Sequence, residues 1–280
     1  MRSFFGKPLK YKIQGTVKYV FLLLVSVISL YPFVWVLITS LKDNNDIYGN
    51  SFGLPRVFRW ENYSEAWKGA SAGRSFFNSL FVCMITLVIL AVITSMGSYI
   101  LTRVAKSKLL STYFSLGLMI PIHALLIPSV LIFKYLKLTD NLFSLVLVYT
   151  AVNISFSMFI MNGFLKSIPK EIDEAATIDG CGKARVFFQI LLPIAKPGLA
   201  TVATLAFLNC WNDLLLGLVV ISTPAKRTLS VAISVLKGSY LTQYGLLCAG
   251  FAISIAPVVI MYLLFQKQVI AGMTAGAVKG

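Results

Sequence analysis

The sequence is poor in charged residues. Only 12% of its 280 residues are Asp, Glu, Lys or Arg, whereas 58% are hydrophobic. Soluble globular domains carry about 25% charged residues, because they must cover their surface for contact with water. The composition and the mean hydropathy of +0.82 therefore exclude an ordinary soluble domain and predict a chain that lies in a lipid bilayer.

Cysteine and histidine are scarce as well, and this narrows the possible chemistry. The four cysteines Cys83, Cys181, Cys210 and Cys248 form no CxxC pair, and His123 is the single histidine. The sequence also lacks an HExxH motif and a P-loop. We therefore expect no metal site, no catalytic residues and no cofactor bound by this chain. If ATP and Mg²⁺ are used, another chain must bind them.

Acidic residues are outnumbered by basic ones, 10 against 25, so the formal net charge is +15. The basic residues lie in short clusters between apolar runs and do not form one stripe. A stripe would be typical of a nucleic-acid-binding surface. We therefore expect anionic lipid headgroups as the partner of these clusters, and no nucleic acid.

Long apolar runs are the main feature of the sequence. A bilayer core about 30 Å thick requires roughly 20 apolar helical residues. Runs without any charged residue cover residues 19–41, 75–102, 109–133, 141–165 and 238–266, and a further run over 197–225 contains only Asp213. We predict an all-α polytopic membrane protein with six transmembrane helices. The first run is too long for a signal peptide and lacks a small-residue cleavage site after it, so we expect it to remain as an anchor.

No linker, low-complexity tract or repeat divides these spans. We therefore treat residues 1–280 as a single transmembrane domain, with a five-helix core over about 75–266. Six spans place both termini on one side of the membrane. The loops on that side contain 15 of the 25 Lys and Arg residues. Cytoplasmic loops are enriched in these residues, so both termini are predicted to lie in the cytoplasm.

The cytoplasmic loop over residues 166–196 is longer than a connection requires. Ser167 can cap a helix with Pro169 in its first turn, and acidic residues follow near the positive end of the helix dipole. Gly180 and Gly182 mark its end. The pattern predicts a helix of about three turns outside the membrane.

The spacing within this helix favours docking over catalysis. Ile172, Ala175, Ala176 and Asp179 share one face, and the two alanines would let the backbone approach a groove in a partner. A second helix is expected from about residue 183 to 192, ending before Pro193, with Pro197 in the first turn of the fifth span. The loop is then a helical elbow fixed to the membrane bundle.

The loop resembles the EAA loop of binding-protein-dependent ATP-binding-cassette importers. The matching positions are Glu174-Ala175-Ala176, three residues, Gly180, nine residues and then Ile190-x-Leu192-Pro193. The chain as a whole resembles the six-span permease of carbohydrate uptake systems of the maltose-transporter type. The segments that carry this resemblance are Ser40-Leu41-Lys42, Asn62-Tyr63, Met119-Ile120-Pro121, Ile127-Pro128, Gly163-Phe164, Ile168-Pro169, Trp211-Asn212-Asp213 and the tail over 274–280. A plain soluble-facing connector is the alternative interpretation of the loop.

The resemblance implies a permease subunit of an importer in a bacterial cytoplasmic membrane, working by alternating access. Its partners would be a second permease, a dimer of cytoplasmic ATPases that bind ATP and Mg²⁺, and an extracytoplasmic solute-binding protein. The binding protein is expected to deliver a carbohydrate, with an oligosaccharide as the expected form. The residues implied to couple the permease to the ATPase are Glu174, Ala175, Ala176, Asp179 and Gly180. An ion-coupled secondary transporter and an importer of a non-sugar solute remain as alternatives.

Four residues of the fifth span are candidates for the translocation pathway: Asn209, Trp211, Asn212 and Asp213. An intramembrane carboxylate usually faces a bundle interior, a cavity or a partner charge. An indole and two amides can stack on a sugar and hydrogen-bond its hydroxyls. Equally, these side chains could hold the span against the partner permease. His123 is expected to bond a carbonyl freed by a nearby proline, with a proton-carrying role as the alternative.

Overall fold

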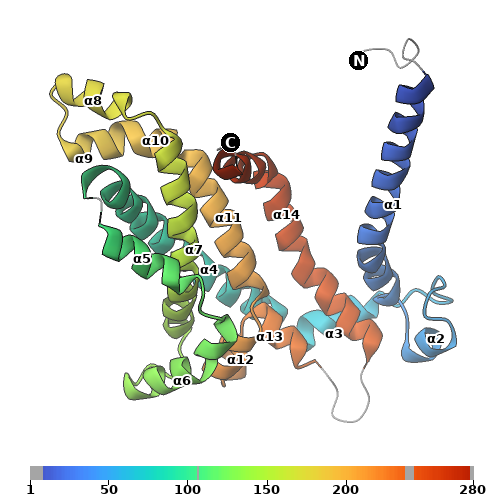
Figure 1. Ribbon diagram of the computed structural model, residues 1–280. Coiled ribbons are helices and arrows are strands. Elements are labelled where there is room, and N and C mark those ends of the chain that lie inside the picture. Colours follow the sequence, from blue (N-terminus) through green and yellow to red (C-terminus); the bar gives the residue numbers. More distant parts are fainter. Residues whose placement is uncertain (1–8, 106, 237–242, 278–280) are drawn as a thin grey trace. The chain divides into compact units, whose positions relative to one another are not determined.

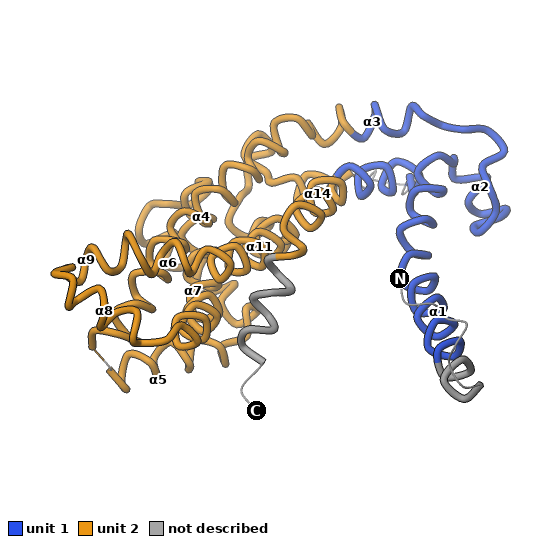
Figure 2. Tube along the Cα trace, turned by 90° about the horizontal axis from the view of Figure 1, so that it is seen from above, with its two compact units in different colours: residues 1–66, 237–253 blue, residues 67–236, 254–280 orange. Residues whose placement is uncertain are grey.

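The structure, a computed structural model, describes residues 9–105, 107–236 and 243–277. Every regular element within those ranges is a helix, and this confirms the all-α prediction. The chain forms two compact units, residues 1–66 with 237–253 and residues 67–236 with 254–280 (Figure 2). The two units are described separately below.

The first unit contains the N-terminal helix and a folded connection. Helix α1 (Leu9–Thr39) includes a candidate membrane span over Gly15–Thr39 that is apolar on every side, with none of its most apolar stretch buried. A helix that is hydrophobic all round requires lipid or another protein around it. After α1 come α2 (Asn44–Gly49) and the first part of α3 (Glu61–Gly69).

The connection after α1 is held by two of the segments that carry the family resemblance. Asn62 Nδ2 donates to the carbonyl oxygens of Ser40 at 2.8 Å and Lys42 at 3.0 Å. The hydroxyl groups of Tyr63 and Ser40 lie 2.8 Å apart. The start of α14 (Tyr244–Ala277) also approaches closely, because a Cβ at Gly245 would lie 2.1 Å from the Lys42 carbonyl oxygen. Ser40, Lys42, Asn62 and Tyr63 thus form one local structure.

In the second unit, α4 (Ala72–Tyr99), α7 (Leu142–Ser167) and α11 (Lys196–Asn212) pack side by side (Figure 1). One stripe of α4 is almost completely buried, at 2% exposure or less: Ser79, Cys83, Thr86, Leu90, Thr94 and Ser98. Apolar side chains gain little from leaving lipid, so membrane helices associate through small residues that let their backbones approach. Thr94 and Thr102 donate their hydroxyls to carbonyls one turn earlier, which satisfies them inside the bundle.

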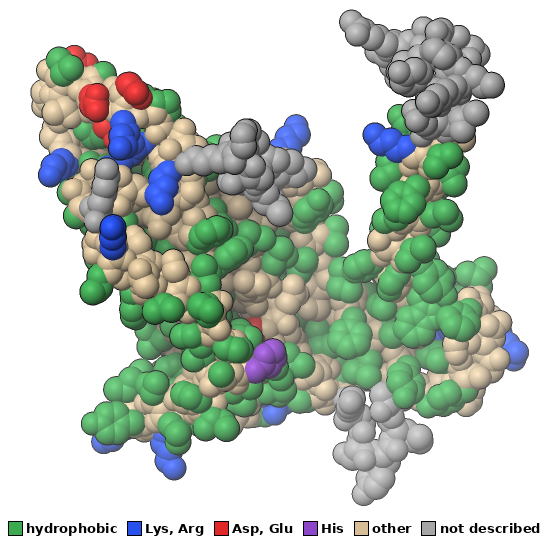
Figure 3. Space-filling model, viewed as in Figure 1, with side chains coloured by type: hydrophobic (Ala, Val, Ile, Leu, Met, Phe, Trp, Pro, Cys, Tyr) green, Lys and Arg blue, Asp and Glu red, His purple; other side chains and the backbone are tan. Residues whose placement is uncertain are grey.

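The predicted third span is broken. Helix α5 (Lys108–Gly117) is followed by the short 3-10 helix η3 (Ile122–Leu125) and by α6 (Leu126–Tyr135), and the two parts are bent by 93°. Pro121 lies at the break with extended backbone, where it lacks a hydrogen-bond donor to continue the helix. The predicted span over 109–133 therefore corresponds to a bent pair of helices and not to one straight helix. His123 lies in η3 and is exposed to the surroundings (Figure 3).

The fifth span also differs from a straight helix. Residues Lys183–Ile194 and α11 meet at an angle of 69°, and α11 ends at Asn212. The chain then forms α12 (Leu215–Val220), the 3-10 helix η5 (Pro224–Lys226) and α13 (Leu229–Ser234). A single span over 197–225 was thus incorrect beyond Asn212. The described residues contain four helices able to cross a bilayer, or up to six spans if each bent pair counts as one.

Candidate functional site

The predicted docking helix is α8 (Glu171–Ile178), which is eight residues long. It ends where the glycine pattern predicted. Gly180 has a φ of +84°, its N–H donates to the Thr177 carbonyl at 3.0 Å, and the Cys181 N–H donates to the Ala176 carbonyl at 2.9 Å. This pair of bonds is the Schellman arrangement, in which glycine is favoured because it adopts the left-handed conformation without strain.

The beginning of α8 differs from the prediction. Helix α7 continues through Ser167, whose hydroxyl donates to the Phe164 carbonyl at 2.7 Å and caps nothing. Pro169 holds Ile168 in extended backbone, as prolines do to the residue before them. Consequently α8 starts only after Lys170, and the expected length of about three turns was too long.

The side chains of α8 divide between the chain's own core and the outside. Ala176 is 7% exposed and packs in a cluster with Leu165, Ile168 and Leu191, with Ile172 partly buried against it. Glu174, Ala175, Asp179 and Gly180 are exposed. The face predicted from Ile172, Ala175, Ala176 and Asp179 was therefore wrong, because half of it packs inward. Figure 3 shows acidic side chains on the outer surface of α8.

The elbow after α8 is one continuous helical segment. It consists of α9 (Lys183–Arg185), the π-helix η4 (Val186–Leu191) and α10 (Leu192–Ile194). It runs through Pro193, so the predicted end before that proline was wrong. The Leu192 N–H donates to Phe187, five residues earlier, and this wider turn accommodates a residue without a backbone donor. Pro197 lies in the first turn of α11, as predicted.

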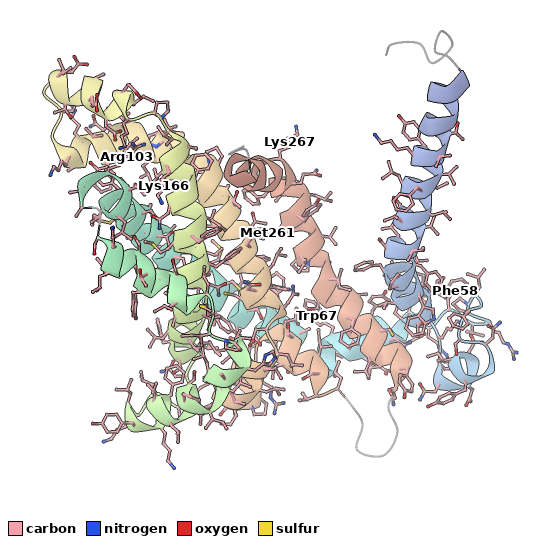
Figure 4. All side chains as sticks on the ribbon, viewed as in Figure 1. Phe58, Trp67, Arg103, Lys166, Met261 and Lys267 are labelled. Carbon is pink, nitrogen blue, oxygen red and sulfur yellow. The ribbon has the colours of Figure 1, made fainter. Side chains whose placement is uncertain are left out.

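Arg103 is the main contact that the sequence interpretation missed. It lies in the π-helix η2 (Ile100–Val104) that ends α4, with its side chain 6% exposed (Figure 4). Its Nη2 donates to the carbonyls of Leu165 at 2.8 Å and Ile168 at 2.6 Å. Its Nε lies 3.2 Å from Asp173 Oδ2 on α8. In the sequence it counts only as one more cytoplasmic charge, and its position at the end of a span was the one available signal.

The pathway candidates do not share one surface. Trp211 is 1% exposed, stacks on Phe207 and donates its indole N–H to the Ser254 carbonyl at 3.1 Å. Asp213 is half-buried and accepts hydrogen bonds from the Tyr149 hydroxyl and the Gly217 N–H. These two side chains are used within the subunit.

The two amides of this group are exposed. Asn209 and Asn212 lie three residues apart on α11, and Asn209 Nδ2 donates to Asn153 Oδ1 at 2.9 Å. A hollow of about 630 Å³ opens elsewhere, between α5, α7 and α11. Its lining includes Phe156, Phe159, Asn162 and Lys166, and no sequence pattern predicted it.

The bundle therefore carries a short helix with exposed acidic side chains, followed by a helical elbow that leads into α11. Within the described residues, no group of three His, Cys, Asp or Glu side chains could hold a metal ion. The chain belongs to the family of binding-protein-dependent transport system inner membrane components, whose sequence profile matches residues 102–274. This is a family of transport proteins and not a class of enzymes.

Relatives of known role extend the likeness to nearly the whole chain. The chain is 34% identical over 266 residues to the diacetylchitobiose uptake system permease protein NgcG of Streptomyces coelicolor, covering 94% of this chain and 88% of that protein. It is 32% identical over 253 residues to the melibiose/raffinose/stachyose import permease protein MelC of Bacillus subtilis, covering 89% and 91%. Among solved structures, a chain of a bacterial ABC transporter that imports the acidic polysaccharide alginate has the same fold, with a TM-score of 0.78 and 24% identity over 93% of this chain and 98% of that one.

Proposed function

We propose that this chain is one permease subunit of an ATP-binding-cassette importer that moves a carbohydrate across the cytoplasmic membrane. A second permease, a dimer of cytoplasmic ATPases and an extracytoplasmic solute-binding protein complete the transporter. The single observation that carries the proposal is the geometry of α8, a short helix fixed on an elbow with one face free. The names of two relatives mention uptake of diacetylchitobiose and import of melibiose, raffinose and stachyose. These names support a carbohydrate as the solute.

The free surface of α8 is the proposed docking site for the ATPase. It consists of Glu174, Ala175, Asp179 and Gly180, with Ile178 85% exposed beside them. An isoleucine so exposed at the end of a cytoplasmic helix suits burial in a groove, and Glu174 can form a charge-assisted hydrogen bond with a basic residue. Ala176 takes a supporting role, because it anchors α8 to this chain's own core. ATPase closure then moves α8 and the bundle attached to it, and alternating access follows.

Asn209 and Asn212 are the proposed pathway residues of this subunit. Amide groups donate and accept hydrogen bonds and can exchange bonds with a succession of sugar hydroxyls. Trp211 and Asp213 hold α11 and α12 in place and are not proposed to contact the solute. The variant Asn212→Leu should raise the sugar concentration for half-maximal uptake without changing the amount of assembled transporter. Asn209→Leu should raise it too, but it also removes the hydrogen bond to Asn153.

The proposed orientation places both termini and α8 in the cytoplasm. Single cysteines at Ile178 and Tyr135, which are 85% and 87% exposed, would test it in a chain without its native cysteines. A membrane-impermeant maleimide applied to intact spheroplasts should label position 135 and spare position 178. The reverse pattern would overturn the orientation.

The function itself is tested by purifying the tagged chain in mild detergent, identifying its companions by mass spectrometry and reconstituting the complex in liposomes. We expect a second permease, an ATPase and uptake of a radiolabelled oligosaccharide that requires internal ATP and the binding protein. Uptake driven by an ion gradient without any ATPase would favour the secondary transporter. ATP-dependent uptake of another solute, with no sugar bound by the binding protein, would refute the carbohydrate assignment alone.

A further inference from the structure

We propose that Arg103 is the positioning residue that locks the docking helix α8 to the membrane bundle, so that ATPase movement reaches α4 and α7 together. The inference rests on the proposed docking role of α8. It concerns a side chain that is 70 positions from its partner Asp173 and outside the EAA pattern. Three separate segments meet at this one guanidinium: the end of α4, the end of α7 and the first turn of α8.

The first step is the burial of the charge. The Arg103 side chain is 6% exposed and that of Asp173 is 20% exposed. A buried charge is costly unless it is paired and hydrogen-bonded, and removing one partner leaves the other uncompensated. Asp173 provides the opposite charge for Arg103, and the carbonyls of Leu165 and Ile168 accept two N–H bonds. Removing either side chain would therefore leave the other charge without its partner.

The second step concerns the carbonyls that Arg103 contacts. The last carbonyls of a helix have no partner within it and form the negative end of its dipole. Leu165 lies in the last turn of α7, and Ile168 immediately follows that helix. Arg103 thus binds the end of α7 through its backbone. This contact fixes the position of the helix end, whichever side chains surround it.

The third step is a second attachment of the same loop. The Tyr99 hydroxyl donates to the Lys183 carbonyl at 3.1 Å, and its ring lies 5.1 Å from that of Phe187. Tyr99 immediately precedes η2, so one end of α4 holds the loop both at α8 and beyond it, at α9. A helix held on both sides cannot swing about one hinge. It must move with α4 and α7 as a rigid body.

The planar guanidinium is required by this geometry. The two N–H bonds of Nη2 reach the Leu165 and Ile168 carbonyls in fixed directions while Nε lies against the Asp173 carboxylate, whereas a lysine ammonium is a single point of charge. Arg103→Lys should therefore retain part of the function, and Arg103→Met should retain least. Arg185→Met is the matched control, because Arg185 is exposed in the same loop and, within the described residues, its side chain bonds to Gln189, at 2.8 Å.

The test is the number of sugar molecules transported per ATP hydrolysed by the complete transporter in liposomes. For Arg103→Met we expect the ATPase to co-purify and hydrolyse ATP, while transport per ATP falls about tenfold or more, as expected for opening a buried ion pair. Asp173→Asn, which keeps the side-chain volume, should lower the same ratio, and it replaces Arg103→Met if that variant fails to assemble. A wild-type ratio in an assembled Arg103→Met or Asp173→Asn transporter would overturn the inference.

A distance measurement separates positioning from a general loss of stability. Spin labels at Glu171 in the first turn of α8 and Phe159 on α7, both exposed and outside the proposed docking surface, report whether α8 moves with the bundle. The distance distribution should be narrow in the wild type with and without ATP, and broad in Arg103→Met. Equal widths would contradict the lock. If the wild-type transporter itself shows no ATP-driven uptake, the proposed function fails; if it does and Arg103→Met matches it, only this inference fails.

Discussion

The hydroxyl of Tyr149 lies 2.7 Å from Oδ2 of Asp213, and this bond joins the middle of α7 to the residue that follows α11. The same oxygen accepts the Gly217 N–H at 2.9 Å. Asp213 thereby starts α12, so a carboxylate that interrupts an apolar run in the sequence serves as the joint between two helices.

Tyr149→Phe should lower the free energy of unfolding of the purified subunit by about 1–2 kcal/mol, because the carboxylate loses a hydrogen-bond donor. Thermal denaturation of the purified subunit measures the change. Asp213→Ala should lower the free energy of unfolding further, since it removes the acceptor of both the Tyr149 hydroxyl and the Gly217 N–H. Tyr135→Phe, at a side chain that is 87% exposed, is the control for removing a hydroxyl. A large change in sugar affinity at unchanged stability would instead return Asp213 to the pathway.

Gly180→Ala should impair ATPase docking while membrane insertion continues. Gly180 has a left-handed φ of +84°, and a Cβ there would meet no atom within 4 Å, so the cost is backbone strain of about 1–2 kcal/mol. Gly180→Val should abolish ATP-driven uptake, since a β-branched side chain tolerates this conformation worst. Gly182 is equally open but has a φ of −70°, so Gly182→Ala should leave uptake intact. Equal losses for both alanine variants would refute the conformational explanation.

Ala175 and Ala176 are adjacent but should fail in different ways. Ala175→Phe adds bulk to the free surface of α8, so we expect a stable permease that no longer co-purifies with the ATPase. Ala176→Phe adds bulk to a side chain that packs inside the chain, where overpacking costs about 1–3 kcal/mol. That variant should lose thermal stability before any ATPase is added. Finding the two phenotypes exchanged would reverse the assignment of faces.

Gly245→Ala should disrupt the connection after α1. The added Cβ would lie 2.1 Å from the Lys42 carbonyl oxygen, a backbone atom that cannot rotate away. We expect a protease to cleave this connection faster in the variant. Gly49→Ala is the control, because Gly49 also lies in this unit and has no atom within 4 Å of the added Cβ. Unchanged cleavage of Gly245→Ala would show that the two segments are not in contact.

The hydrogen bonds of Asp140 predict that the stability of the folded subunit falls at acidic pH. The Thr223 hydroxyl and N–H, with Lys226 and Ser222, hold the pKa of this carboxyl well below its ordinary value of about 3.9. A depressed folded-state pKa adds stability above the unfolded pKa, and that stability is lost as pH falls toward the folded pKa. The melting temperature of the wild type should therefore fall as the pH is lowered from about 5 to 2. The fall should be less steep for the variant Asp140→Asn. Identical slopes, with exposed Glu61→Gln as reference, would contradict this role.

The local features of the fold could be predicted from the sequence because their causes are local. Lack of charge over some 20 residues is sufficient to place a span, and the left-handed turn at Gly180 follows from the absence of a Cβ. Pro197 opens α11 because a first-turn proline gives up no hydrogen bond. Pro121 could also be identified in the sequence. Whether a proline kinks a helix or ends it depends on the neighbouring helices, however, and here the helices before and after Pro121 meet at 93°.

The remainder depends on contacts between distant residues. Ser167 has the residue type of a helix cap, yet its hydroxyl donates a hydrogen bond to a carbonyl in α7. Trp211 has the side chain of a sugar-binding residue, yet Phe207 and the Ser254 carbonyl enclose it. Arg103 reaches groups more than 60 positions away, and no periodicity reports such a pairing. Local pattern therefore located the loop proposed to dock the ATPase but could not assign its inner and outer residues.

The two π-helical turns, η2 and η4, have a consequence for how this chain can change in evolution. A π turn holds one residue more than an α-helix would, and each residue of an α-helix turns the chain by about 100°. Deleting one of the three residues that precede Arg103 in η2 would rotate Arg103 away from the end of α7, whichever of the three was lost. We therefore expect the number of residues in these two segments to be kept among relatives. Substitutions should be tolerated at several positions there, whereas insertions and deletions should be selected against.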